Sequence, residues 1–290
     1  MALDLPSWEL DGRHWPNRSC SSFVEHAGFR WHLQRAGAGP VVLLIHGTGA
    51  STHSFSALLP LLAARHTVIA PDLPGHAFTR SPPGFVPNLS GMASALAQLL
   101  QHLGLRPQRV VGHSAGAAIG AQLCLTEQLR PTLLFALNGA FFPFRGLPGL
   151  VFPQVARWLG RAEAPALVLS ARAKDPANVR RVIESTGSFL SDEGLGLYQR
   201  LAARPGHLAA VLGMLAVWDL APLVRSLPTL STPLHLLVGA RDRAVPPSQA
   251  DDLRRLIPTA TITTIDAGHL MHEEQPEVVA KIIEAAEART

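Results

Sequence analysis

Short continuous apolar runs alternate along this chain with longer segments whose apolar residues recur at helical spacing. The run VVLLIH at 41–46 lies between Gly-Pro and Gly, and it is typical of a strand buried on both faces of a parallel sheet. Similar runs predict strands at 66–72, 109–113, 132–138, 233–242 and 259–266. Helical spacing predicts helices over 56–64, 91–103, 115–126 and 248–256, and a last helix from about Pro276. This alternation predicts an α/β fold with a mostly parallel, doubly wound sheet.

Two regions depart from this rhythm. Residues 22–35 show partial alternation broken by the turn dipeptide Ala27-Gly28, which predicts two short paired strands. Between 140 and 228 the strand-like runs stop, and polar stretches and the apolar segment Leu208–Trp218 replace them. We therefore expect one core, formed by 1–139 and 229–290, interrupted after its sixth strand by a mostly helical cap over 140–228.

Composition narrows the function classes. The chain has 290 residues, of which 47% are hydrophobic, enough for one large core. The net charge is +4, but the basic residues are scattered arginines with lysine only at 174 and 281, so nucleic-acid binding is not expected. Cys20 and Cys124 are isolated and have no metal-like spacing. We expect no disulfide framework, no metal site and no cofactor.

The N-terminal sequence also bears on location. MALDLPSWELDG carries acidic residues where a secretory peptide would need positive charge, and no long apolar region follows. The apolar segment Leu208–Trp218 is too short to span a bilayer and ends at Asp219, so it is either a buried helix or part of a lid. We expect a cytoplasmic protein with no transmembrane segment.

Ser114 is the candidate nucleophile. It is the central residue of Gly112-His113-Ser114-Ala115-Gly116, which follows a predicted strand and precedes a predicted helix. This is the context in which a G-x-S-x-G motif forms a tight turn that projects the serine hydroxyl. The alternative is a serine that only caps a helix. A nucleophile would also need a base, an acid and oxyanion donors at the ends of other strands.

His269 is the candidate base, because DAGHLMHEEQP comes directly after the last predicted strand and before the last helix. His272 is the rival, but Glu273 and Glu274 beside it indicate the polar start of a helix. The candidate acid is Asp242, which ends LLVGARD, and the order serine, acid, histidine is the one that this fold uses.

Other positions are weaker candidates for the acid. Asn138 ends the preceding core strand, where an acid can also lie, but an amide cannot supply the negative charge. Asp72 is more simply a turn residue, and Asp266 is too close in sequence to His269 to reach its ring well.

The oxyanion donors are expected from the backbone amides of Ala115, which follows the nucleophile, and of Thr48 in the loop after the first buried strand. Aromatic residues in the cap would give an apolar surface suited to flat or hydrophobic ligands, although a cap needs such residues for its own core. The cap aromatics are Phe141, Phe142, Phe144, Phe152, Trp158 and Trp218. The candidate substrate-binding residues are His46, Gly47, His113, Asn138, Phe141, Phe144 and Trp218.

Taken in order, LLIHGTGAS, APDLPGH, VVGHSAGA, LLVGARDRAVP and DAGHLMHEEQP resemble the α/β-hydrolase superfamily over essentially the whole chain. A narrower resemblance, carried by WELDGRHWPNRSCSSFVEHAGFRWHLQ, HGTGASTHSF and PDLPGHAFT, is to the magnesium-chelatase accessory proteins of bacteriochlorophyll biosynthesis in photosynthetic bacteria. It implies a role at magnesium insertion into protoporphyrin IX. Many relatives have glycine where this chain has Ala77, after the histidine of the P-G-H turn.

Several functions stay open within this fold. Dehalogenases and epoxide hydrolases resemble each other in using an aspartate nucleophile, and epoxide hydrolases also use paired cap tyrosines; this chain has Ser114 and only Tyr198. Esterase, thioesterase, carbon-carbon hydrolase and perhydrolase chemistry can share one triad. The main expectation is an ester or acyl hydrolase acting on a hydrophobic small molecule. The alternative is a non-catalytic accessory protein that binds a tetrapyrrole or the magnesium-chelatase subunits, with Arg145 and Arg157 meeting porphyrin propionates or simply facing solvent.

Overall fold

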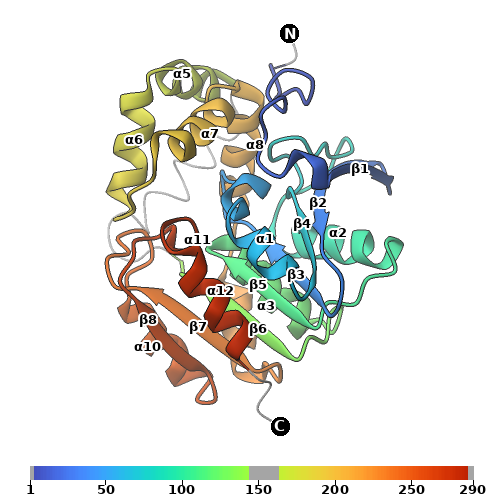
Figure 1. The fold of residues 1–290 in the computed structure, drawn as a ribbon, viewed down its shortest axis with the longest axis vertical. Coiled ribbons are helices and arrows are strands. Elements are labelled where there is room, and N and C mark those ends of the chain that lie inside the picture. Colours follow the sequence, from blue (N-terminus) through green and yellow to red (C-terminus); the bar gives the residue numbers. More distant parts are fainter. Residues whose placement is uncertain (1–2, 144–162, 287–290) are drawn as a thin grey trace.

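A computed structural model of the chain describes residues 3–143 and 163–286 (Figure 1). Its centre is an eight-stranded sheet in the order β1-β2-β4-β3-β5-β6-β7-β8. The β1–β2 and β2–β4 pairs are antiparallel and the other pairs are parallel. The strands are β1 (Ser21–His26), β2 (Phe29–Ala36), β3 (Val41–Ile45), β4 (Thr67–Pro71), β5 (Arg109–His113), β6 (Leu133–Leu137), β7 (Leu234–Gly239) and β8 (Thr261–Ile265).

Helices cover both faces of this sheet. One face packs against α1 (Leu58–Ala63) and α12 (Pro276–Ala285), which contact each other. The other face packs against α2 (Leu89–His102), α3 (Ala115–Leu125), α9 (Ala221–Ser226) and α10 (Ser248–Leu256). The predicted α/β class is confirmed.

The central strands bury both of their faces, as the continuous apolar runs predict. In β3, Leu43 and Ile45 belong to the core on the α2 and α3 side, whereas Val42 and Leu44 belong to the core on the α1 and α12 side. Alternate residues of a strand point to opposite faces, so every position must be apolar. The order β4-β3-β5 places the reversal of strand order at β3, where the loops after β3 and β5 form a crevice.

Most of the predicted elements agree with the structure to within two residues. The helix predicted from residue 91 begins at Leu89, because the Asn88 side chain accepts a hydrogen bond from Gly91 N at 2.8 Å and caps that end. The strand predicted to reach residue 242 ends at Gly239, since the chain turns there and Asp242 N donates to Gly239 O. The hairpin turn has positive φ at both Ala27 (50°) and Gly28 (79°).

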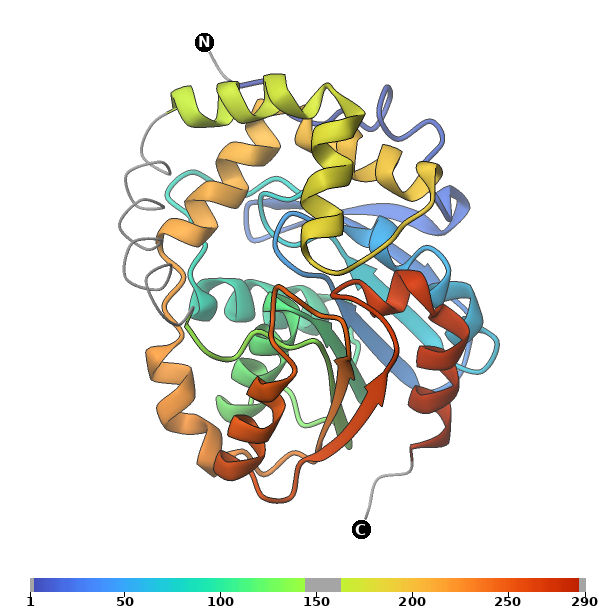
Figure 2. The ribbon, with the colours of Figure 1, turned by 90° about the vertical axis from the view of Figure 1, so that its left-hand side faces the viewer.

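A group of helices follows β6 and lies over one end of the sheet (Figure 2). Its members are α5 (Glu163–Ala173), α6 (Pro176–Ser185), α7 (Asp192–Ala202) and α8 (Pro205–Ala216). We call these four helices the cap. The predicted helical insertion after the sixth strand is therefore confirmed, whereas α9 packs against α3 in the helix layer of the core.

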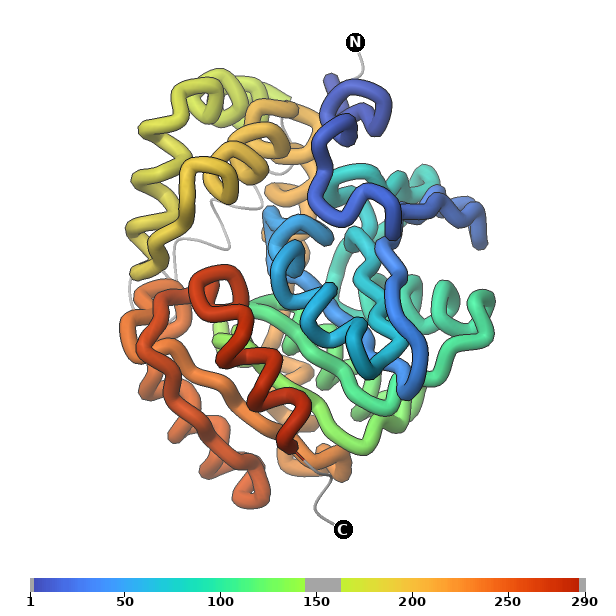
Figure 3. The backbone as a smooth tube through the Cα atoms, in the orientation of Figure 1, coloured from blue at the N-terminus to red at the C-terminus, as the bar shows by residue number. Residues whose placement is uncertain are grey.

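The N-terminal segment lies against the cap, as the dark blue tube of Figure 3 shows. Gly206 N donates to Asp4 O at 2.7 Å, and Arg204 pairs with Asp4 at 2.6 Å and with Asp11 at 2.8 Å. Trp15 packs in one cluster with core and cap side chains, and its Nε1 donates to Thr52 Oγ1 at 3.0 Å. The segment from Asp4 to Trp15 thus connects the cap to the core.

A membrane-spanning helix must be both long enough and apolar enough to cross the bilayer. No single helix in the described part of the chain meets both. The helix pair Pro205–Ala216 and Ala221–Thr229 meets them together, by length and composition only, with a bend of 50° between the two.

Candidate active site

Ser114 lies on a sharp turn between β5 and α3, with φ of 52° and ψ of −118°. This conformation is strained for a residue with a side chain, by roughly 1–3 kcal/mol. Backbone hydrogen bonds hold it: Ser114 N donates to Leu137 O at 3.0 Å, and Ala117 N and Ala140 N both donate to Ser114 O at 3.1 Å. The turn that the motif predicts is present.

The glycines around the turn permit close backbone approach. A Cβ atom on Gly116 would lie 2.1 Å from Ile45 O, and one on Gly112 would lie 2.5 Å from Ala117 N. A Cβ on Gly47 would lie 3.0 Å from Ser114 Cβ, so the loop after β3 also depends on glycine to pass the serine. Side chains at these positions would force the strand, loop and helix apart.

Asp242 and His269 are hydrogen-bonded, with His269 Nδ1 2.8 Å from Asp242 Oδ2. The Asp242 side chain is fully buried, and its Oδ1 accepts hydrogen bonds from Ala244 N at 2.7 Å and Val245 N at 2.9 Å. A carboxylate on Nδ1 keeps the imidazole proton there and leaves Nε2 free to accept one. His269 and Ser114 line the same cavity, so the structure brings the three predicted residues together.

Two buried side chains hydrogen-bond to the backbone of residues 266–270, between β8 and α11, which we call the histidine loop. His269 O accepts hydrogen bonds from His113 Nε2 and from Asn138 Nδ2, both at 3.0 Å. Asn138 also donates to Gly268 O at 2.9 Å and accepts from Gly239 N at 2.7 Å. The His113 and Asn138 side chains therefore hold the backbone of His269 against the ends of the strands.

His272, the rival base, lies in α11 (Met271–Glu274) and is completely buried. Burial lowers the pKa of its imidazole to about 3. It is not among the residues that line the cavity with Ser114. The geometry favours His269.

The loop after β3 and the start of α3 present two free amides to the cavity. Thr48 and Ala115 both line it beside Ser114. Within the described chain, the backbone N–H groups of these two residues donate no hydrogen bond. The positive end of the α3 dipole lies at Ala115, where negative charge is stabilised. This is the arrangement that an oxyanion site requires.

The cavity itself has a volume of about 360 Å³ and an apolar wall. Its wall includes Val211, Leu215 and Trp218, from α8 and the residues after it, and Phe142 and Val245 from the core loops. The described residues of the wall include no Asp, Glu, Lys or Arg. The cavity therefore suits an uncharged, hydrophobic group.

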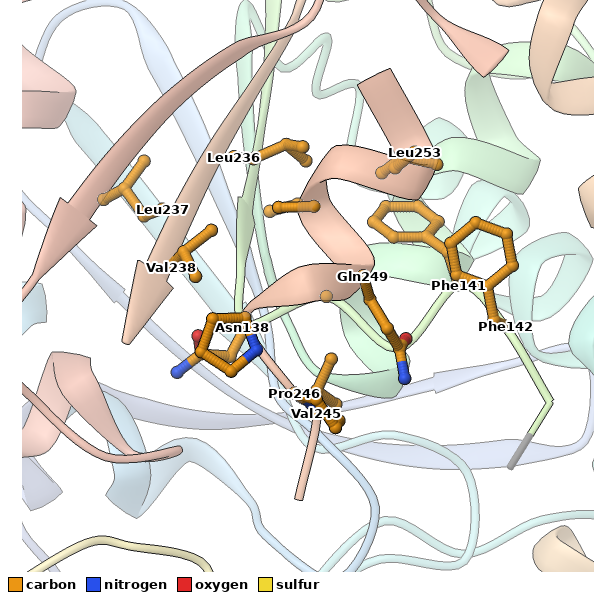
Figure 4. A pocket seen from close by; sticks show the side chains of 14 residues that line it. Asn138, Phe141, Phe142, Leu236, Leu237, Val238, Val245, Pro246, Gln249 and Leu253 are labelled. Atoms are coloured by element: carbon orange, nitrogen blue, oxygen red, sulfur yellow. The ribbon is translucent and has the colours of Figure 1, made fainter. Parts of the chain in front are cut away.

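Of the described residues predicted to bind substrate, Trp218 lines this cavity and the others do not. His46, Gly47, His113, Asn138 and Phe141 are buried and are not part of this wall. Asn138 and Phe141 line a separate void of about 20 Å³ (Figure 4). Phe144, Phe152, Trp158, Arg145 and Arg157 lie outside the described residues.

His46 has a clear structural task. Its Nδ1 donates to Gly47 O at 2.8 Å and its Nε2 accepts from Leu73 N at 2.8 Å. Burial lowers the pKa of the imidazole to about 4, so it stays neutral and can make both bonds. His46 thus ties the loop that carries Thr48 to the loop after β4.

Two cap contacts with the site were not visible in the sequence. His207 of α8 accepts from Ala77 N at 3.1 Å, and its Nε2 lies 3.3 Å from Gly49 O in the Thr48 loop. Ser188, after α6, accepts from Leu270 N at 2.8 Å in the histidine loop. Neither residue belongs to a motif, so the sequence offered no signal for them.

Comparison with known proteins shows what this chain is similar to. Residues 42–282 match the model of the alpha/beta hydrolase family. The chain is 39% identical to the magnesium-chelatase 30 kDa subunit of Rhodobacter capsulatus, over 90% of this chain and 92% of that protein. It is 26% identical to the 2-hydroxy-6-oxo-2,4-heptadienoate hydrolase of Pseudomonas putida, over 89% and 93%. An alpha/beta hydrolase fold protein from Burkholderia ambifaria superposes with a TM-score of 0.77 at 24% identity, covering 91% of this chain and 97% of that one.

Proposed function

Because the chain belongs to the alpha/beta hydrolase family, we propose that it is a serine hydrolase that cleaves an ester or related acyl group of a hydrophobic substrate. The observation that carries the proposal is the hydrogen-bonded Asp242–His269 pair facing the same cavity as Ser114. Fold alone would not support a reaction, since this fold carries many functions.

In the proposed reaction, His269 Nε2 takes the proton of the Ser114 hydroxyl as Ser114 Oγ attacks the acyl carbon. Asp242 stabilises the imidazolium that forms. The amides of Thr48 and Ala115 bind the oxyanion of the tetrahedral intermediate, and each such donor is typically worth about 100- to 1000-fold in rate. His269 then protonates the leaving group, and water releases the acyl group by the same steps.

A fluorophosphonate probe tests this proposal. We expect the wild type to be labelled covalently and Ser114→Ala to be unlabelled. Ser90→Ala, which changes an exposed serine in α2, is the matched control and should be labelled at the wild-type rate. A folded wild type that the probe does not label would refute the hydrolase function.

A second candidate function is a non-catalytic accessory role, in which the protein binds a tetrapyrrole or chelatase subunits at the magnesium-chelation step of bacteriochlorophyll biosynthesis. The similarity to the magnesium-chelatase 30 kDa subunit favours it. An absorbance titration with protoporphyrin IX should then show a spectral shift at micromolar protein. Restoration of pigment synthesis by Ser114→Ala in a deletion strain would support this role over catalysis.

A further inference from the structure

One polar group in the cavity wall has no part in the proposed reaction. Gln249 is the second residue of α10 and lines the cavity together with Ser114 and His269. Its Oε1 atom is buried and has no hydrogen-bond partner in the described chain. Buried polar atoms are nearly always paired, so an unpaired carbonyl at a ligand cavity calls for an explanation.

The surroundings of Gln249 explain why the protein does not satisfy this oxygen. The two residues directly before α10, Pro246 and Pro247, have no N–H to donate. Of the three amides that follow, two are already used, since Gln249 N donates to Pro246 O at 2.9 Å and Ala250 N to Pro247 O at 3.1 Å. Gln249 also lines the separate void of about 20 Å³, where Figure 4 shows its amide extending from α10 near Phe142 and Val245.

The apolar wall makes this oxygen selective. The other polar groups of the described wall, on Thr48, Ser114 and His269, belong to the proposed reaction centre. A ligand that brings an O–H or N–H group to Gln249 would pair the oxygen, whereas an all-apolar ligand would leave it unpaired. One neutral hydrogen bond of this kind changes affinity by roughly 10-fold.

We propose that Gln249 is a specificity-determining residue whose Oε1 accepts a hydrogen bond from a hydroxyl or N–H group on an otherwise apolar, uncharged substrate. The proposal rests on the proposed hydrolase function for the reaction but not for binding. It narrows the substrate class to neutral esters that carry one hydrogen-bond donor away from the scissile bond. A carboxylate on the buried part is disfavoured, because no cation in the described wall would pair with it.

Kinetics on matched esters test the proposal. The panel consists of p-nitrophenyl esters of 3-phenylpropanoic acid with a meta or para hydroxyl, and of 6-hydroxyhexanoic and 8-hydroxyoctanoic acids, each beside its methoxy and unsubstituted analogues. The methoxy group keeps the oxygen but removes the donor. We expect at least one hydroxyl ester to exceed its methoxy analogue about 10-fold in kcat/KM in the wild type. Gln249→Leu should abolish that preference, while Gln101→Leu, on an exposed residue of α2, should keep it.

A binding experiment separates this proposal from the hydrolase function. The corresponding methyl ketones, which cannot be hydrolysed, are titrated calorimetrically into Ser114→Ala with and without Gln249→Leu. A hydroxyl preference in binding that Gln249→Leu removes would support Gln249 even if the wild type hydrolyses nothing. Absence of any hydroxyl preference across the panel, or its persistence in Gln249→Leu, would overturn the proposal while leaving Ser114 labelling intact.

Discussion

Replacing Asn138 tests whether the histidine loop is held from below. This side chain makes three buried hydrogen bonds, to Gly239 N, Gly268 O and His269 O. Its φ is 44°, a left-handed conformation that asparagine tolerates better than alanine. Asn138→Gly therefore removes the hydrogen bonds without adding backbone strain. Asn138→Ala removes the same hydrogen bonds and also adds backbone strain.

The expected magnitude follows from the groups left unpaired. His269 O keeps its bond from His113 Nε2, but Gly239 N and Gly268 O lose the side-chain partner that Asn138 provides. Each of these two buried groups left unpaired costs about 1–3 kcal/mol, so we expect Asn138→Gly to lower the free energy of unfolding by about 2–6 kcal/mol. Asn138→Ala should lose about 1 kcal/mol more through strain.

Two measurements check these values. Urea unfolding gives the free-energy difference, and the melting temperature should fall by about 5–15 °C in Asn138→Gly. The rate of Ser114 labelling by a fluorophosphonate should fall by about 10- to 100-fold, because His269 loses a support that sets its height. If the free energy of unfolding of Asn138→Gly lies within about 0.5 kcal/mol of the wild-type value, and labelling is equally fast, the Asn138 hydrogen bonds do not stabilise the histidine loop.

Two further predictions concern the sharp turn at Ser114 and the buried histidines. Gly116→Ala should prevent stable folding, because its Cβ would lie 2.1 Å from Ile45 O. Gly196→Ala in α7, whose Cβ would have no atom within 4 Å, should raise the free energy of unfolding by up to about 1 kcal/mol. Soluble yield and urea unfolding of the two variants check this. Burial lowers the pKa to about 3 or 4 in His46, His53, His76, His207 and His272. The unfolded chain therefore binds more protons below about pH 6.5, and stability is lost as the pH falls from there. The same holds for His113, whose pKa burial lowers well below its usual range. Glu273, whose pKa burial raises to about 8, offsets about one of these six protons, so we expect about 4–5 kcal/mol to be lost between about pH 6.5 and 5.5. Equal urea midpoints at the two pH values would contradict this.

The sequence predicted where the strands lie along the chain, and the class of fold, because those signals are local. A buried parallel strand needs a continuous apolar run, and the residues that follow such runs gather at one edge of the sheet. For this reason Ser114, Asp242 and His269 could be chosen from three separate motifs. The same reasoning could not show that His113 and Asn138 hydrogen-bond to His269 O and lie outside the cavity wall, because those contacts join separate loops.

The sequence by itself thus determined the core fold and the candidate triad, each of which follows from short-range pattern and chain order. Tertiary packing decided what the pocket is made of. Val211 and Leu215 line the cavity from α8, whose His207 contacts the loops at Ala77 and Gly49, and Gln249 lines it from α10. These contacts join residues 100 or more positions apart, such as His207 and Gly49, with |i−j| of 158. No local period encodes such a pairing, because it depends on how separate elements pack in three dimensions.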